Sequence, residues 1–117
     1  MTKKIEYEIS SGNVFEDLAL PNAQERLVKA KLASKIIEIA QEKNLTQKKI
    51  AAFLEIDQPK VSALYNGRLT GFSISRLFKF LMLFDQDIDI LIKEKSNNHY
   101  AFGHLTVHFD NNLRASL

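Results

Sequence analysis

Two short helical patterns follow one another near the middle of this 117-residue chain. The first begins after Thr46 and the second after Asp57, both of which are residue types that cap helix N-termini. Asn66-Gly67 then stops the second pattern. Pro59 does not interrupt it, because the N–H groups of a first helical turn have no partner within the helix. The segment is therefore predicted to form two helices of about two turns each, joined by a turn of roughly three or four residues.

The inner face of this helix pair is suited to packing. Two short helices that cross steeply need a small residue at the crossing, an apolar residue in the turn and two buried positions in the second helix. Ala51, Ile56, Val61 and Leu64 meet these requirements. Spacing alone does not distinguish a DNA-binding helix-turn-helix from another helical hairpin packed in a bundle, so both interpretations stay open at this point.

The outer face of the second helix carries no acidic residue. Glutamine can bond the edge of adenine, and alanine or proline can contact the methyl group of thymine, so this face suits the major groove of DNA. Amide and basic residues around it are suited to phosphates. We therefore predict a base-reading centre with a charged rim. The centre comprises Gln58, Pro59, Lys60, Ser62, Ala63 and Tyr65, and the rim comprises Gln47, Lys48, Lys49, Asn66, the Gly67 backbone and Arg68.

Longer amphipathic patterns flank the pair. Before it, Asn22 and Glu25 have the spacing of a capping box, and the helical pattern ends near Asn44. After it, Ser73 caps a fourth helix whose apolar stripe, up to Phe84, is too wide for one core-facing side. The excess predicts a second buried contact, which we interpret as a candidate dimer surface. The apolar positions are Leu32, Ile36, Ile39 and Ala40 before the pair, and Ile74, Leu77, Phe78, Phe80, Leu81, Met82, Leu83 and Phe84 after it.

Two later segments, residues 88–92 and 105–109, alternate between apolar and polar residues as strands do. They could pair as a hairpin, although the intervening residues 94–103 are long for a hairpin loop, or each could pair with a strand of another subunit. The first of these segments is a further candidate for the dimer surface.

The positive charge is concentrated in the middle of the chain. Residues 26–84 carry eleven basic and four acidic side chains, and both ends are net acidic. This distribution is typical of nucleic-acid binding, although a solvated lysine-rich helix face gives the same count. The chain has no cysteine, no hydrophobic signal region and no apolar run of membrane length. We therefore expect a cytoplasmic protein of one domain that does not enter a membrane.

Three runs within the helix pair carry a family resemblance. Leu-Thr-Gln-Lys-Lys-Ile-Ala at 45–51, Ile-Asp-Gln-Pro-Lys-Val-Ser at 56–62 and Asn-Gly-Arg at 66–68 closely resemble the phage-repressor-like (Cro/C1, or XRE) helix-turn-helix family. The resemblance covers roughly residues 36–84 and implies a lambda-repressor-like fold that binds double-stranded operator DNA as a homodimer. By position, the DNA-contact roles of the family fall on Gln47, Gln58, Pro59, Lys60, Ser62, Ala63, Asn66 and Arg68.

A narrower resemblance spans residues 11–93. Ser-Gly-Asn-Val-Phe-Glu-Asp-Leu at 11–18, Leu-Pro-Asn-Ala at 20–23 and Gly-Phe-Ser at 71–73 are similar to the subgroup that contains HigA-type antitoxins. It implies a dimeric repressor of its own operon, and it allows for a cognate toxin that cleaves mRNA on the ribosome. The alternative function is a toxin-neutralising protein-interaction module with little DNA specificity.

Two features depart from the family pattern. Many relatives have glycine at the turn position of Glu55, where a left-handed backbone would cost a side-chain-bearing residue about 1 kcal/mol, and the carboxylate would weaken DNA binding slightly. The turn is therefore expected to differ. The chain also continues past the usual end of the family near Lys93, and the resemblance gives no role to residues 96–117.

Other clusters predict no site. His104 and His108 would lie about 13 Å apart on a strand, too far for one metal ion. Alternating Asp85, Asp87 and Asp89 are typical of a solvated, charge-protected strand face. No phosphate-binding loop or catalytic triad is visible, so we expect no enzymatic activity, no cofactor and no metal.

These patterns together predict a mainly α-helical fold, a lambda-repressor-like bundle of four to five helices with a short C-terminal β element. Residues 1–21 are predicted to form an arm, residues 22–84 the helix-turn-helix DNA-binding domain, and residues 85–117 a strand extension and tail.

Overall fold

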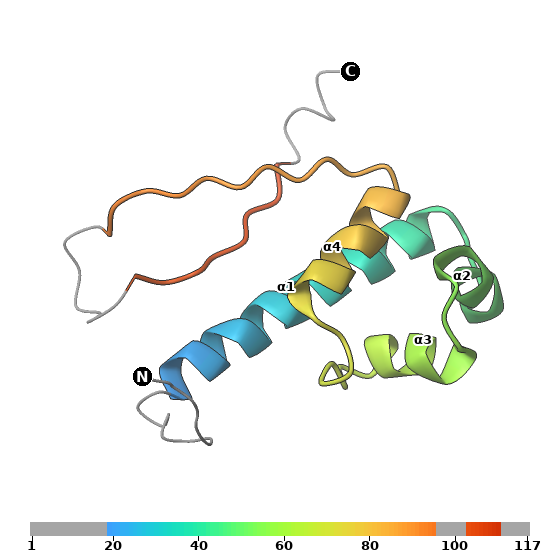
Figure 1. Ribbon diagram of the computed structural model, residues 1–117. Coiled ribbons are helices and arrows are strands. Elements are labelled where there is room, and N and C mark those ends of the chain that lie inside the picture. Colours follow the sequence, from blue (N-terminus) through green and yellow to red (C-terminus); the bar gives the residue numbers. More distant parts are fainter. Residues whose placement is uncertain (1–18, 96–102, 111–117) are drawn as a thin grey trace.

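The computed structural model describes residues 19–95 and 103–110 (Figure 1), and the predicted arm before residue 19, residues 96–102 and the end of the predicted tail lie outside this part. The described residues form four helices, α1 (Ala19–Glu42), α2 (Gln47–Leu54), α3 (Gln58–Tyr65) and α4 (Ile74–Leu83). The long helix α1 packs against α4 and α3, and α2 packs against α3 beyond the C-terminal end of α1 (Figure 1). The predicted helix-turn-helix bundle of four to five helices is confirmed, with four helices in the described residues, whereas the predicted C-terminal β element is not present there.

One cluster of buried apolar side chains joins the four helices. The inward faces predicted for α1, α2 and α3 are all buried, which matters because helices of eight residues, such as α2 and α3, are marginal without tertiary packing. The cluster comprises Val28, Leu32, Ala33, Ile36, Ile39, Ala40, Ile50, Ala51, Leu54, Val61, Leu64, Leu69, Phe72, Leu77, Phe80, Leu81 and Phe84.

The helix starts follow the predicted caps with one exception. The Thr46 hydroxyl accepts a hydrogen bond from the Lys49 N–H at 3.1 Å, and the Ser73 hydroxyl caps α4 in the same way. Asp57 holds the N-cap backbone conformation before α3, but its carboxylate makes no capping hydrogen bond. The prediction that Asn22 caps α1 is wrong, because α1 begins at Ala19. A proline at position 21 does not prevent this earlier start, since the first N–H groups of a helix need no intrahelical partner.

All four helices end in the same way. One residue just past each end has a left-handed backbone, and the following N–H bonds back to a carbonyl five residues earlier, at 2.9 to 3.0 Å. This arrangement uses otherwise unpaired carbonyl groups and turns the chain sharply towards the next element. The left-handed residues are Asn44, Glu55, Gly67 and Asp85.

Neither predicted strand is present in the described residues. Residues 103–110 lie along α1 instead, where the Leu105 N–H donates to Gln24 Oε1 at 2.9 Å and Lys31 Nζ donates to the Val107 carbonyl at 3.3 Å. Of the apolar residues that the alternation places on the two inner faces, Val107 and Ile88 pack against the cluster, whereas Leu105, Phe109, Ile90 and Ile92 are exposed. Backbone groups of the second segment bond to side chains of α1 rather than to a neighbouring strand, so no ladder forms.

The wide apolar stripe of α4 is only partly covered. Leu77, Phe80 and Leu81 are buried in the cluster, whereas Met82 and Leu83 are exposed. The second contact that this stripe predicts is therefore not made by the described residues of the same chain.

Among the described residues no helix has both the length and the apolar character needed to cross a membrane.

Candidate nucleic-acid interface

The α2–α3 pair has a short and well-anchored turn. Three residues, 55–57, connect the two helices, and Ile56 packs against the buried cluster. The expectation that the turn would differ from a left-handed one is wrong, because Glu55 has φ 60° and ψ 47° in spite of its Cβ. The Ile56 N–H bonds to the Ala51 carbonyl at 3.0 Å, which ties the turn to the last turn of α2. The partly buried Ile56 side chain and this hydrogen bond together fix the angle between α2 and α3.

The outer face of α3 is open at its N-terminal end. Gln58, Pro59 and Lys60 are exposed, and Ser62 and Ala63 behind them are half-buried. Within the described part of the chain the Gln58 amide makes no hydrogen bond, so its donor and acceptor are available to a base edge. Tyr65 packs partly against the cluster and is therefore less accessible than the other predicted members of the centre.

The C-terminal end of α3 holds its polar groups in fixed positions. Asn66 Nδ2 donates to Ser62 Oγ at 3.3 Å, so these two predicted contact residues are already linked. The Gly67 N–H donates to the Leu64 carbonyl at 3.3 Å, and the Arg68 N–H to the Ala63 carbonyl at 2.9 Å. The Gly67 N–H, which we expected to face a phosphate, is thus engaged within the helix end, and the exposed Arg68 side chain is the cationic group that remains there.

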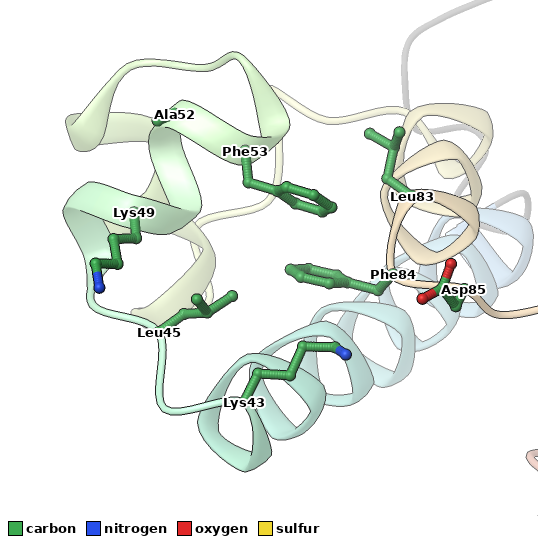
Figure 2. A pocket seen from close by; sticks show the side chains of 8 residues that line it. All are labelled: Lys43, Leu45, Lys49, Ala52, Phe53, Leu83, Phe84 and Asp85. Atoms are coloured by element: carbon green, nitrogen blue, oxygen red, sulfur yellow. The ribbon is translucent and has the colours of Figure 1, made fainter.

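Gln47 and Lys48 form the rim on the side of α2. Both are exposed in its first turn, next to the Thr46 cap. Neither α2 nor α3 has an acidic residue in its first turn, but the exposed Asp57 carboxylate at the N-cap of α3 offsets part of the partial positive charge there, whereas the N-terminus of α2 has no such carboxylate. The arrangement favours an anionic ligand along this side of the pair. Lys49 differs from the other rim residues, because it lines a groove between α2 and α4 (Figure 2).

The structure adds one basic residue, Arg26, to the candidate interface. A groove of about 440 Å³ between α1 and the end of α3 is lined by Arg26 and Lys29 from α1 and by Arg68. Lys29 is ion-paired with Glu25 at 3.4 Å, whereas Arg26 is exposed. The excess of basic residues from position 26 onwards is the sequence signal that could have identified Arg26. The position of Arg26 beside Arg68, however, depends on how α1 packs on α3.

Comparisons with known proteins agree with this geometry. A family model described as a helix-turn-helix domain matches residues 14–93. A solved structure, provisionally described as an XRE family transcriptional regulator, is 40% identical to this chain and superposes with a TM-score of 0.67 over 76% of this chain and 100% of that one. No curated protein matches. Because the family model covers more than half of the sequence, the chain belongs to this family of DNA-binding, non-enzymatic helix-turn-helix domains.

Proposed function

We propose that the protein is a sequence-specific transcriptional regulator that reads double-stranded DNA with the N-terminal half of α3. The observation that carries this proposal is the exposed first turn of α3, which follows the Asp57 cap, has no acidic residue of its own and presents the Gln58 amide without a partner among the described residues. Gln58 would bond adenine, while Pro59 and Ala63 would contact thymine methyl groups. Lys60 would lie beside these base-reading residues, and Gln47, Lys48, Asn66 and Arg68 would hold the phosphates, with Ser62 orienting Asn66.

We further propose that the regulator is a homodimer. Helix-turn-helix proteins of this type bind half-sites about 34 Å apart, which one domain cannot contact alone. The exposed Met82 and Leu83 of α4 and the exposed segment 90–92 supply apolar surface that supports such a partnership.

The resemblance to HigA-type antitoxins supports a narrower role. We propose that the operator lies upstream of the protein's own gene, which makes the protein a cytoplasmic autorepressor. We also propose that a cognate toxin, encoded next to the same gene, is its protein partner. A toxin-like reading frame of about 100 codons next to the gene is the expected finding.

A second candidate function is a toxin-neutralising interaction module with little DNA specificity. The apolar residues 90–92, which no described part of the chain covers, favour it. The two functions differ in their salt dependence, because phosphate contacts make DNA affinity fall steeply with salt.

The experiment is an electrophoretic mobility shift with the upstream region and with scrambled DNA, each at two salt concentrations. Gln58→Ala is expected to weaken binding to the upstream region by about 10- to 100-fold, the value of one bidentate base contact, and to leave binding to scrambled DNA unchanged. Gln41→Ala, which removes an exposed glutamine of α1, is the matched control.

Equal weakening on both DNAs would remove Gln58 from base reading. A wild-type protein with no preference for the upstream fragment would contradict autorepression and support the interaction module.

A further inference from the structure

A groove of about 560 Å³ opens between α2 and the end of α4, on a surface to which α3 contributes nothing (Figure 2). Its walls are apolar, with Phe53 and Leu45 on one side and Leu83 and Phe84 on the other. Phe53 and Leu83 remain 47% and 41% exposed, and the neighbouring Met82 is 53% exposed. Apolar side chains gathered in this way, rather than scattered singly, mark a surface that binds another molecule.

The rim of this groove carries two lysines and one carboxylate, that of Asp85, so it is net basic. Lys43, just after α1, and Lys49, on α2, both line it and are both exposed (Figure 2). Within residues 19–95 and 103–110 neither lysine forms an ion pair. An occupant that satisfies both the walls and the rim therefore combines aliphatic side chains with carboxylates.

The chain itself contains such a segment. Residues 87–92 read Asp-Ile-Asp-Ile-Leu-Ile, and the last three side chains are 72%, 82% and 89% exposed. The segment begins just beyond Asp85, at the edge of the groove, but Figure 1 shows it running away from α2. The chain thus contains two complementary features that do not contact each other. One is a groove with apolar walls and a net basic rim, and the other is an aliphatic segment with acidic residues.

We propose that the groove binds residues 87–92 of a second copy of this chain. Asp87 and Asp89 face Lys43 and Lys49 across the contact, and the aliphatic residues that follow pack on Phe53 and Leu83. A two-fold axis makes the exchange reciprocal, so that each copy fills the groove of the other. The inference rests on the dimeric regulator proposed above and names the surfaces that join its subunits.

Charge reversal tests this exchange in the absence of DNA. The groove variant is Lys43→Glu with Lys49→Glu, and the tail variant is Asp87→Lys with Asp89→Lys. All four side chains are exposed, so the core is unaffected, and circular dichroism checks the fold. In each variant alone both contacts of the dimer become repulsive, and sedimentation equilibrium is expected to show a dimer dissociation constant raised by at least about tenfold.

Mixing the two variants distinguishes exchange between copies from other arrangements. In the mixed dimer the unchanged tail meets the unchanged groove, and the reversed tail meets the reversed groove, so a 1:1 heterodimer of near wild-type affinity is expected. A chain with all four substitutions is expected to form homodimers again. Lys60→Glu with Lys79→Glu changes the net charge as much as the groove variant does but lies outside the groove, and it is expected to dimerise normally.

Leu91→Glu probes the apolar half of the contact. This side chain is 82% exposed, so the substitution is expected to raise the dissociation constant by at least about tenfold without unfolding the chain. Wild-type monomers, variants that dimerise normally, or a mixture without heterodimers would each overturn the exchange; the last result would indicate a tail that binds its own groove or a different partner. Because no DNA is present, failure here leaves the DNA-reading role of α3 untouched, and loss of operator preference alone leaves the exchange untouched.

Discussion

Phe53 of α2 and Phe84 at the end of α4 stack with their ring centroids 5.0 Å apart and their planes 27° apart. Phe84 is almost fully buried, whereas Phe53 is half exposed at the edge of the groove in Figure 2. The stack joins the first helix of the DNA-binding pair to the end of α4.

The two partners of this stack are expected to differ in their cost of truncation. Phe84→Ala should lower the free energy of unfolding by about 3–5 kcal/mol, because it leaves a cavity in the core. Phe53→Ala should cost only about 1 kcal/mol, chiefly the aromatic contact. Urea denaturation in a Leu91→Glu background keeps dimer dissociation out of both measurements. Equal costs would show that Phe53 is more buried in solution than the structure has it.

The three caps provide a second comparison. Thr46→Ala and Ser73→Ala each remove a hydroxyl that accepts a helix N–H, and each should lower the free energy of unfolding by about 1 kcal/mol. Asp57→Ala should cost clearly less, since its carboxylate makes no capping hydrogen bond and contributes only through the helix dipole. Chemical denaturation of the three variants ranks them. A loss for Asp57→Ala as large as the other two would mean that the carboxylate caps α3 in solution.

Glu55 offers a substitution that stabilises. Its left-handed backbone is strained for a residue with a Cβ, so Glu55→Gly should raise the free energy of unfolding by up to about 1 kcal/mol. Removing this carboxylate from the DNA-binding pair should also tighten DNA binding slightly. The control is Ala52→Gly on the exposed face of α2, where the same residue type in a helical conformation should cost about 1 kcal/mol. Thermal melting checks the opposite signs; destabilisation by both would show that the Glu55 side chain makes a contact that outweighs its strain.

Local chemistry made much of this fold predictable. Thr46 and Ser73 could be identified as caps because the preference of an N-cap depends on a few neighbouring atoms. Asn66-Gly67 ended α3 for the same reason. Asn44 and Asp85 also take the left-handed conformation, which asparagine and aspartate adopt more readily than other residues that carry a Cβ, but only the end of the helix near Asn44 was predicted, and not the conformation of either residue.

Contacts between distant segments were not predictable. Residues 105–109 alternate as a strand does, but periodicity does not say which groups will bond to a backbone, and here Gln24 and Lys31 of α1 do so. The same holds for the candidate site. The outer face of α3 followed from helical spacing, whereas the place of Arg26 beside Arg68 needed the packing of α1 against the end of α3.

Arg26 is expected to extend the DNA contact beyond the helix pair. It lines the same groove as Arg68, which follows α3, so a phosphate of the bound duplex next to Arg68 would also be within the field of Arg26. Each phosphate contact contributes about one unit to the slope of log affinity against log salt, so Arg26→Ala and Arg68→Ala should each reduce that slope by roughly one and weaken binding to all sequences alike. Fluorescence anisotropy over a series of salt concentrations measures the slope. Lys93→Ala removes an exposed cation outside both grooves and should leave it unchanged. A slope that falls for Arg68→Ala but not for Arg26→Ala would confine the phosphate contacts to the helix pair and would show that α1 serves only to carry it.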